Sequence, residues 1–176
     1  SRLSAKQADV YDRKSLIKLL RDFDVVAGAL PHKMAVSTAK ACISAGINMV
    51  DLAFEQEQML LADDAEKAKI TFIPGCGVAP GLTNILAGRG AEQMEKVDEI
   101  HIMCGGIPQT PKPPLFYKVV FTLESVWGEY TRGPRIVKNG KVKIVKPLLG
   151  LEKVKFPEPF GELESFYTDG LATLLY

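Results

Sequence analysis

The sequence lacks long apolar runs and is poor in cysteine and histidine. None of its apolar runs approaches the roughly 18 residues that a membrane-spanning helix needs, so no membrane partner is predicted. Its three cysteines, Cys42, Cys76 and Cys104, are widely spaced and odd in number, and so indicate neither a disulfide framework nor a metal-ligand set. Only two histidines occur, and neither clusters with cysteine. We therefore expect a protein without a metal site, in a reducing, cytoplasmic compartment.

The sequence also lacks an excess of charge of either sign. Its net charge is +1, which gives no general attraction to nucleic acid. Eight basic residues lie between Arg132 and Lys155, but no aromatic residues alternate with them, as a nucleic-acid site would require. We interpret that stretch as the solvated face of a hairpin. With 176 residues, 47% of them hydrophobic, the chain is long enough for one medium domain or two small ones.

The first half alternates between apolar runs and amphipathic stretches with short links. Apolar runs at residues 25–30, 47–52 and 70–73 predict buried strands, and helical spacing at 15–23, 34–45 and 54–69 predicts the helices around them. A further helix is expected from about residue 82. This order is typical of a parallel sheet with right-handed crossovers, an α/β fold.

The second half follows a different pattern, beginning near residue 94. Strands are predicted at residues 97–104 and 116–123, separated by a stretch with four prolines at 107–114, and a short helix is predicted at 125–130. Residues 135–145 form a hairpin with an Asn139-Gly140 turn, and 154–156 and 163–167 are further strands. We therefore predict a mostly antiparallel α+β domain at 94–176, after a first domain at 1–93.

Residues 70–87 hold the strongest local indication of a binding site. A short apolar strand ends at Pro74, and three glycines and two prolines lie within residues 74–81, directly before the predicted helix. Ligands of open α/β sheets bind beyond the carboxyl ends of the strands, where helix N-termini offer free N–H groups. The loop is therefore predicted to face a ligand, although glycines used only for turning would give the same pattern.

Four stretches together resemble the saccharopine dehydrogenase-like superfamily of NAD(P)-dependent amino-acid dehydrogenases. They are DVVAGALP (24–31), GCGVAPGLTN (75–84), CGGIPQ (104–109) with FYK (116–118), and GELESFYTDG (161–170). Within the superfamily the chain is most similar to the L-lysine dehydrogenase (ε-deaminating) group. The resemblance implies an NAD cofactor, with NADP also open, a small amino-acid substrate, and a homodimer formed through the antiparallel half.

Members of this family open with a Gly-x-Gly-x-x-Gly phosphate loop, and this sequence has none. Gly75 and Gly77 do not form that loop, because no third glycine follows at the required spacing. The resemblance therefore implies the C-terminal half of a Rossmann-type parallel sheet, followed by part of a substrate and dimerisation domain. Since the chain also starts at Ser1 and stops at Tyr176 without end signals, we expect a fragment of a longer protein. Because the diphosphate loop is missing, we expect this fragment to bind NAD weakly or not at all and to be inactive alone.

The resemblance places several residues around the cofactor. Gly28, Ala29, Leu30 and Pro31 would run along its nicotinamide end, and Gly75 and Gly77 would shape the floor of the cleft; a plain strand end is the alternative for the first group. Asp51 ends the second strand and is a candidate both for the cofactor ribose and for catalysis through the substrate amine. It could equally cap the following helix.

The predicted substrate residues come from both halves, and each has an ordinary structural alternative. Cys104 and Tyr117 join Asp51 as catalytic candidates. Nothing near Cys104 in the sequence would activate it as a nucleophile, and it could equally be a small core residue. Tyr117 and Tyr167 could be strand aromatics in the core. Saccharopine-forming relatives tend to carry Asp where this chain has Ala79, which favours a smaller or differently charged substrate. The substrate candidates are His32, Ala79, Asn84, Gly105, Gly106, Tyr167 and Thr168.

The implied reaction is oxidative deamination of L-lysine at its ε-amine, with hydride transfer to NAD. Two alternatives stay open. One is a related imine-reducing enzyme, of the saccharopine or carboxynorspermidine dehydrogenase type. The other is a non-catalytic dimerisation module.

Overall fold

The computed structural model describes residues 3–114, 116–119 and 122–175, with the side chains of 32, 33, 172 and 173 left aside. Contacts within the chain divide it into two compact units, residues 1–82 and 83–176. Each unit is described by itself below. The domain boundary predicted between residues 93 and 94 stays a prediction.

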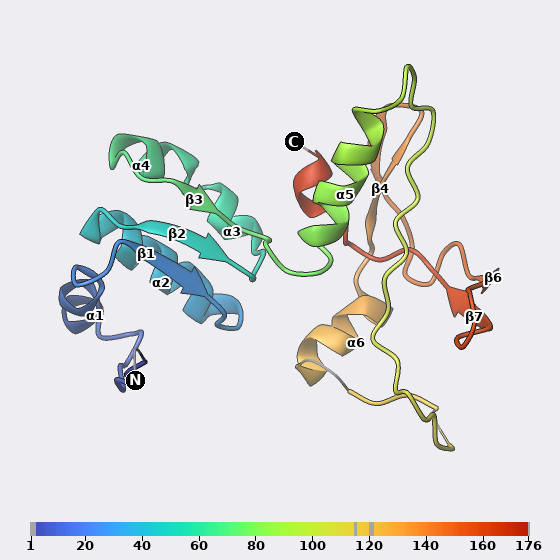
Figure 1. Ribbon diagram of the computed structural model, residues 1–176, viewed down its shortest axis with the longest axis horizontal. Coiled ribbons are helices and arrows are strands. Elements are labelled where there is room, and N and C mark those ends of the chain that lie inside the picture. The colour runs from blue at the N-terminus through green and yellow to red at the C-terminus, as the bar shows by residue number, and fades with distance from the viewer. Residues whose placement is uncertain (1–2, 115, 120–121, 176) are drawn as a thin grey trace. The chain divides into compact units, whose positions relative to one another are not determined.

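Unit 1 is a three-stranded parallel sheet with helices (Figure 1). The strands lie in the order β1-β2-β3, with Gly28 opposite Asp51 and Val50 opposite Ile73. This confirms the predicted parallel arrangement of neighbouring strands. The elements are α1 (Arg13–Leu20), β1 (Val25–Gly28), α2 (His32–Ala45), β2 (Asn48–Asp51), α3 (Gln56–Met59), α4 (Ala62–Lys67) and β3 (Phe72–Ile73).

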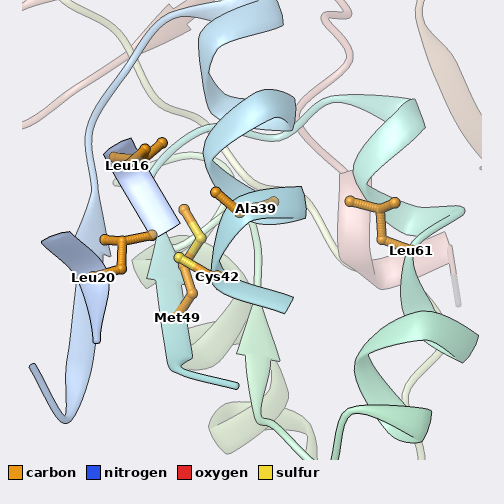
Figure 2. Close-up of a cluster of buried hydrophobic side chains, with 7 residues drawn as sticks. Leu16, Leu20, Ala39, Cys42, Met49 and Leu61 are labelled. Atoms are coloured by element: carbon orange, nitrogen blue, oxygen red, sulfur yellow. The ribbon is translucent and has the colours of Figure 1, made fainter. Parts of the chain in front are cut away.

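The core of unit 1 lies on one face of this sheet (Figure 2). Met49 of β2 is completely buried, whereas Val25 and Ile73, which alternation places on the other face, are 58% and 46% exposed. Helices α1 and α2 supply most of the apolar partners, as their spacing predicted. The buried cluster consists of Leu16, Leu20, Ala39, Ala41, Cys42, Met49 and Leu61.

The helix predicted over residues 54–69 is wrong as a single element. The structure has two short helices, and the chain turns between them with a hydrogen bond from Leu61 N–H to Gln58 O. A capping box of Glu55 and Gln58 starts α3. Helix α4 then begins afresh with Asp63 and Asp64 in its first turn, where acidic side chains complement the helix dipole.

Unit 2 contains two separate antiparallel strand pairs, β4–β5 and β6–β7. The predicted antiparallel pairing is confirmed, and the two pairs belong to separate two-stranded sheets. Asn139 and Gly140 form the predicted hairpin turn with φ angles of 54° and 68°, as a type I′ turn requires. The elements are α5 (Leu82–Ala91, whose first residue falls in unit 1), α6 (Leu123–Thr131), β4 (Arg135–Lys138), β5 (Lys141–Ile144), β6 (Glu152–Lys155), β7 (Glu162–Ser165) and the 3₁₀ helix η1 (Ala172–Leu175).

Two of the strands predicted in this half are wrong. Residues 97–104 are irregular and mostly exposed, because no strand in the described chain offers them hydrogen bonds. In the predicted strand 116–123, residues 120–121 lie outside the described residues and 116–119 are irregular. Leu123 instead opens α6, because the hydroxyl of Thr122 accepts a hydrogen bond from the Ser125 N–H (3.3 Å) and caps the helix two residues before its predicted start.

Candidate cofactor and substrate site

The carboxyl ends of the three parallel strands form one continuous rim, which we call the strand-end rim (residues 28–31, 51–55 and 73–77). Parallel strands bring these ends to the same edge of the sheet. Backbone hydrogen bonds then join the loops that follow them. These bonds run from Leu52 N–H to Gly28 O (3.1 Å), from Cys76 N–H to Asp51 O (2.8 Å) and from Gly75 N–H to Ala53 O (2.9 Å).

Asp51 lies at the centre of the strand-end rim, and its carboxylate points inward. The residue is 0% exposed, and its two oxygens accept hydrogen bonds from Ala53 N–H (3.0 Å) and from the side-chain amide of Gln58 (2.9 Å). Gln58 is 1% exposed, and its own amide oxygen accepts a hydrogen bond from Glu55 N–H (2.9 Å). The carboxylate therefore holds the loop between β2 and α3, a role close to the predicted capping alternative.

The fold packs tightly around Asp51. Burial, and next the charge of Asp51, raise the pKa of the Cys42 thiol to about 11. A Cβ placed on Gly28 would lie 2.6 Å from Met49 Cε and 2.7 Å from Asp51 Cγ. The small residue at Gly28 is therefore needed for packing against the neighbouring strand.

The loop after β1 presents its residues at the surface. Ala29 and Pro31 are exposed, and Leu30 is half-buried. Pro31 is the N-cap of α2, and the backbone of His32 begins that helix, while the side chain of His32 lies outside the described residues. This loop is thus one part of the rim that is accessible to a ligand.

Glycine is required twice in the loop after β3. Gly75 has φ 70° and Gly81 has φ 130°, both in the region that favours glycine. A Cβ on Gly81 would collide with the backbone of Gly77, and the two residues form an isolated parallel bridge. Ala79, between them, is exposed and uncharged. The predicted loop is therefore a tightly folded turn with Ala79 at its surface.

Asn84 is the predicted substrate residue of α5, and its side chain is engaged within unit 2. The residue is 7% exposed, its amide nitrogen donates to Leu171 O (3.0 Å), and its oxygen accepts from the Thr83 hydroxyl (3.1 Å). The side chain thus connects α5 to the segment before η1. In Figure 1, α5 lies next to the C-terminal turn η1.

The other candidates of unit 2 do not lie on strands. Cys104, Gly105 and Gly106 are exposed in the irregular segment, and a Cβ on Gly105 would meet no atom within 4 Å. Tyr117 is half-buried in an irregular stretch. Tyr167 follows β7 and contacts Gly150, and Thr168 beside it is exposed. The strand-aromatic alternative for both tyrosines is therefore wrong.

One residue of the site was missed from the sequence. Gln58 could have been found from the Glu55-x-x-Gln58 spacing, which is a capping-box pattern. Within the described residues, no three His, Cys, Asp or Glu side chains are placed to hold a metal ion, and none of the helices there is long and apolar enough to cross a membrane.

Comparisons with known proteins cover nearly the whole chain. Residues 1–73 match the family described as the saccharopine dehydrogenase NADP binding domain, and residues 77–174 match the saccharopine dehydrogenase C-terminal domain. Alpha-aminoadipic semialdehyde synthase from Arabidopsis thaliana is 30% identical over 67% of this chain, and the mitochondrial enzyme of that name from Bos taurus is 29% identical over 73%. The chain spans only 12% and 15% of these relatives.

A solved structure shows the same fold. Apo histidine-tagged saccharopine dehydrogenase (L-Glu forming) from Saccharomyces cerevisiae superimposes with a TM-score of 0.70 at 21% identity, over 94% of this chain and 39% of that one. The NADP binding match confirms the predicted NAD(P) class of cofactor. The residues of this chain provide only part of a site for NAD(P). The exposed loop at Ala29 and Pro31 suits close approach of a cofactor, but the sequence holds no Gly-x-Gly-x-x-Gly loop for its diphosphate.

Proposed function

Because the chain belongs to the saccharopine dehydrogenase family, we propose that it is part of an NAD(P)-dependent oxidoreductase that acts on the CH–NH2 group of an amino acid. The observation that carries this proposal is the pair of family matches, which together span residues 1–73 and 77–174. The strand-end rim supports it, because an exposed loop of small residues at a sheet edge is the usual place for a dinucleotide's reactive end.

We further propose L-lysine as the substrate, oxidised at its ε-amine. When bound, NAD(P) accepts the hydride from the carbon that carries the amine. The amine loses a proton, and water hydrolyses the resulting imine to the semialdehyde and ammonia. Ala79 supports this choice over saccharopine, since it leaves an exposed, uncharged position where saccharopine-forming relatives tend to carry Asp.

The residues of this chain would contribute orientation. Ala29, Leu30 and Pro31 would lie along the nicotinamide end of the cofactor and exclude water there. Asp51 would hold the rim in place through Ala53 and Gln58, rather than contact the substrate, because both of its oxygens already accept hydrogen bonds inside the fold. Tyr117 and Cys104 stay candidates for proton transfer.

The test is formation of the reduced cofactor by the full-length protein with L-lysine, saccharopine, ornithine and aspartate. We expect turnover with lysine, and an Ala79→Asp variant should lower the preference for lysine over saccharopine. A matched control is Ala8→Asp, the same change at an exposed alanine before α1, which should leave this ratio unchanged. Turnover with saccharopine alone would overturn the lysine assignment. No formation of reduced cofactor with any of the four substrates, in a folded protein, would favour the non-catalytic module.

We also propose a homodimer through the second unit, in a cytoplasmic setting. Exposed apolar side chains support the dimer, since Leu123, Trp127 and Ile144 are 68%, 67% and 76% exposed. Three free cysteines support a reducing compartment. Light scattering of the full-length protein at tens of micromolar should give a dimer mass, and a clean monomer would overturn the dimer.

A further inference from the structure

A groove of about 400 Å³ lies between helices α1, α2 and α4, wholly within unit 1. Lys40 and Ser44 line it from the second half of α2, which leads into β2, and Lys67 lines it from the last turn of α4, which leads into β3. Helices of this kind carry the chain back to the start of the next parallel strand. The groove therefore lies towards the amino ends of the strands, away from the strand-end rim.

The walls of the groove carry an excess of positive charge. Arg13, Lys40 and Lys67 come from three different helices, and the acidic side chain among the described lining residues is Asp64. Within the described chain, none of these four side chains takes part in an ion pair. Lys67 also complements the dipole of α4, in whose last turn it lies, but the other two cations do not lie in the last turn of a helix. Two positive charges thus remain that no described contact neutralises.

Arg13 is held in place at the groove. Its Nη2 donates to Ser44 Oγ (2.8 Å), and the Ser44 hydroxyl donates in turn to Lys40 O (2.8 Å). A guanidinium has five N–H donors in a planar fork, so further donors of Arg13 stay available to a ligand. Arg13 is also the first residue of α1, where a cation opposes the helix dipole. A position that is unfavourable for its own helix and fixed by the neighbouring one suits a binding role.

The groove also has an apolar lining. Leu61 is 6% exposed and belongs to the buried cluster shown in Figure 2. Ile43 and Ala68 line the groove as well and are half-buried. The groove therefore combines cations for an anionic group with apolar surface for a carbon body.

We propose that this groove binds a phosphate monoester, with Arg13, Lys40 and Lys67 around the phosphate and the organic body against the apolar lining. The phosphate of a monoester carries a charge of about −1.5 to −2 at pH 7, which matches the two positive charges that remain in the groove. An arginine binds phosphate oxygens through parallel hydrogen bonds, and lysine binds them as a point charge. This site is separate from the strand-end rim and does not depend on the proposed reaction.

The test is titration calorimetry of phenyl phosphate with the full-length protein, in an excess of NAD and NADP that fills their own phosphate sites. We expect saturable binding, and weaker binding of inorganic phosphate, which lacks the organic body. Lys40→Gln should weaken the binding of phenyl phosphate by about tenfold, the lower end for a hydrogen bond between charged groups, because the groove is open to solvent. Lys18→Gln, at an exposed lysine of α1 outside the groove, should bind as the wild type does.

A variant with the opposite effect guards against misfolding. Asp64→Asn removes the negative charge that lines the groove, and should tighten the binding of phenyl phosphate by about two- to fivefold. Damage to the fold would weaken binding instead. Higher salt should weaken binding by the wild type, because it screens the exposed cations.

The outcomes decide the proposal separately from the lysine reaction. Weaker binding by Lys40→Gln together with tighter binding by Asp64→Asn would support the site, whether or not the protein oxidises lysine. Equal affinities of the wild type and both variants would overturn it, as would the absence of saturable binding by the wild type. Inorganic phosphate that binds as tightly as phenyl phosphate would overturn the assignment of an organic ligand.

Discussion

Exchanging the carboxylate of Asp51 and the amide of Gln58, in the double variant Asp51→Asn/Gln58→Glu, should preserve the strand-end rim. Each of the two changes alone should destabilise it. In the wild type, the amide of Gln58 donates to Asp51 and its oxygen accepts from Glu55 N–H. In Asp51→Asn/Gln58→Glu, the new asparagine amide would donate to the new glutamate, whose other oxygen would accept from Glu55. The asparagine oxygen would still accept from Ala53 N–H. Every hydrogen bond is thus restored, and only the one between residues 51 and 58 runs in the opposite direction.

The cost of Gln58→Glu alone is limited by proton uptake. It would place two buried carboxylates about as close as the present 2.9 Å contact, and such a pair shares one proton. Protonating a glutamate of ordinary pKa near 4.3 costs about 3.7 kcal/mol at pH 7 and about 1 kcal/mol at pH 5. Because the pKa of the pair is raised in the folded state, stability is retained at low pH and lost as pH rises. Asp51→Asn alone should cost about 1–3 kcal/mol, since two amide donors would then face each other.

Cys42 provides the assay, because it is 0% exposed in the core of unit 1 and has a raised pKa. Its alkylation rate under native conditions, followed by peptide mass spectrometry, reports opening of that unit. At pH 7, Gln58→Glu should accelerate alkylation by up to roughly 500-fold over the wild type, and by roughly fivefold at pH 5. The double variant should return close to the wild-type rate. A double variant as labile as Gln58→Glu, or an acceleration equal at the two pH values, would refute the proposed contact.

Two further predictions concern packing and pH. Gly28→Ala should destabilise unit 1 by about 1–3 kcal/mol, because its Cβ would overlap Met49 and Asp51. Gly88→Ala in α5 meets open space and should stabilise its helix by about 0.5–1 kcal/mol. The midpoints of urea unfolding check both changes, and equal effects of the two variants would contradict the packing around Gly28. Burial raises the pKa of Glu129 above its ordinary 4.5, so the free energy of unfolding should fall as pH rises through that raised pKa. Glu129→Gln should flatten this pH dependence in urea titrations followed by the fluorescence of Trp127. An equally steep pH dependence in Glu129→Gln would contradict the burial of this carboxylate.

The sequence was sufficient to predict elements whose partners are close in the chain. The apolar runs that became β1, β2 and β3 are joined by short helical links, and such links leave the parallel order as the natural solution. The Asn139-Gly140 turn specifies its hairpin locally, because both residues adopt positive φ. In each case the deciding interaction lies within a few tens of residues.

Elements whose partners are distant could not be predicted. Residues 97–104 have the apolar content of a strand, but a strand forms only where another backbone completes its hydrogen bonds. The stretch that ends in α6 shows a second limit. Its alternating pattern predicted a strand, whereas the hydroxyl cap at Thr122 started a helix.

The direction of Asp51 was accessible from the sequence, but its partner was not. Met49 and Asp51 are two residues apart on one strand and therefore share a face, so a buried Met49 implies an inward carboxylate. The second donor to that carboxylate, Gln58, lies seven residues away in α3, which the sequence pattern predicted as one helix together with α4. Only the break between α3 and α4 brings its amide to the strand end.

Asp51 shows how hydrogen bonding identifies a structural carboxylate. It lies where a ligand was predicted, but two donors of the chain already satisfy its oxygens. A ligand could bind this carboxylate only by breaking those bonds, so substrate recognition should be sought at the exposed residues of the strand-end rim instead.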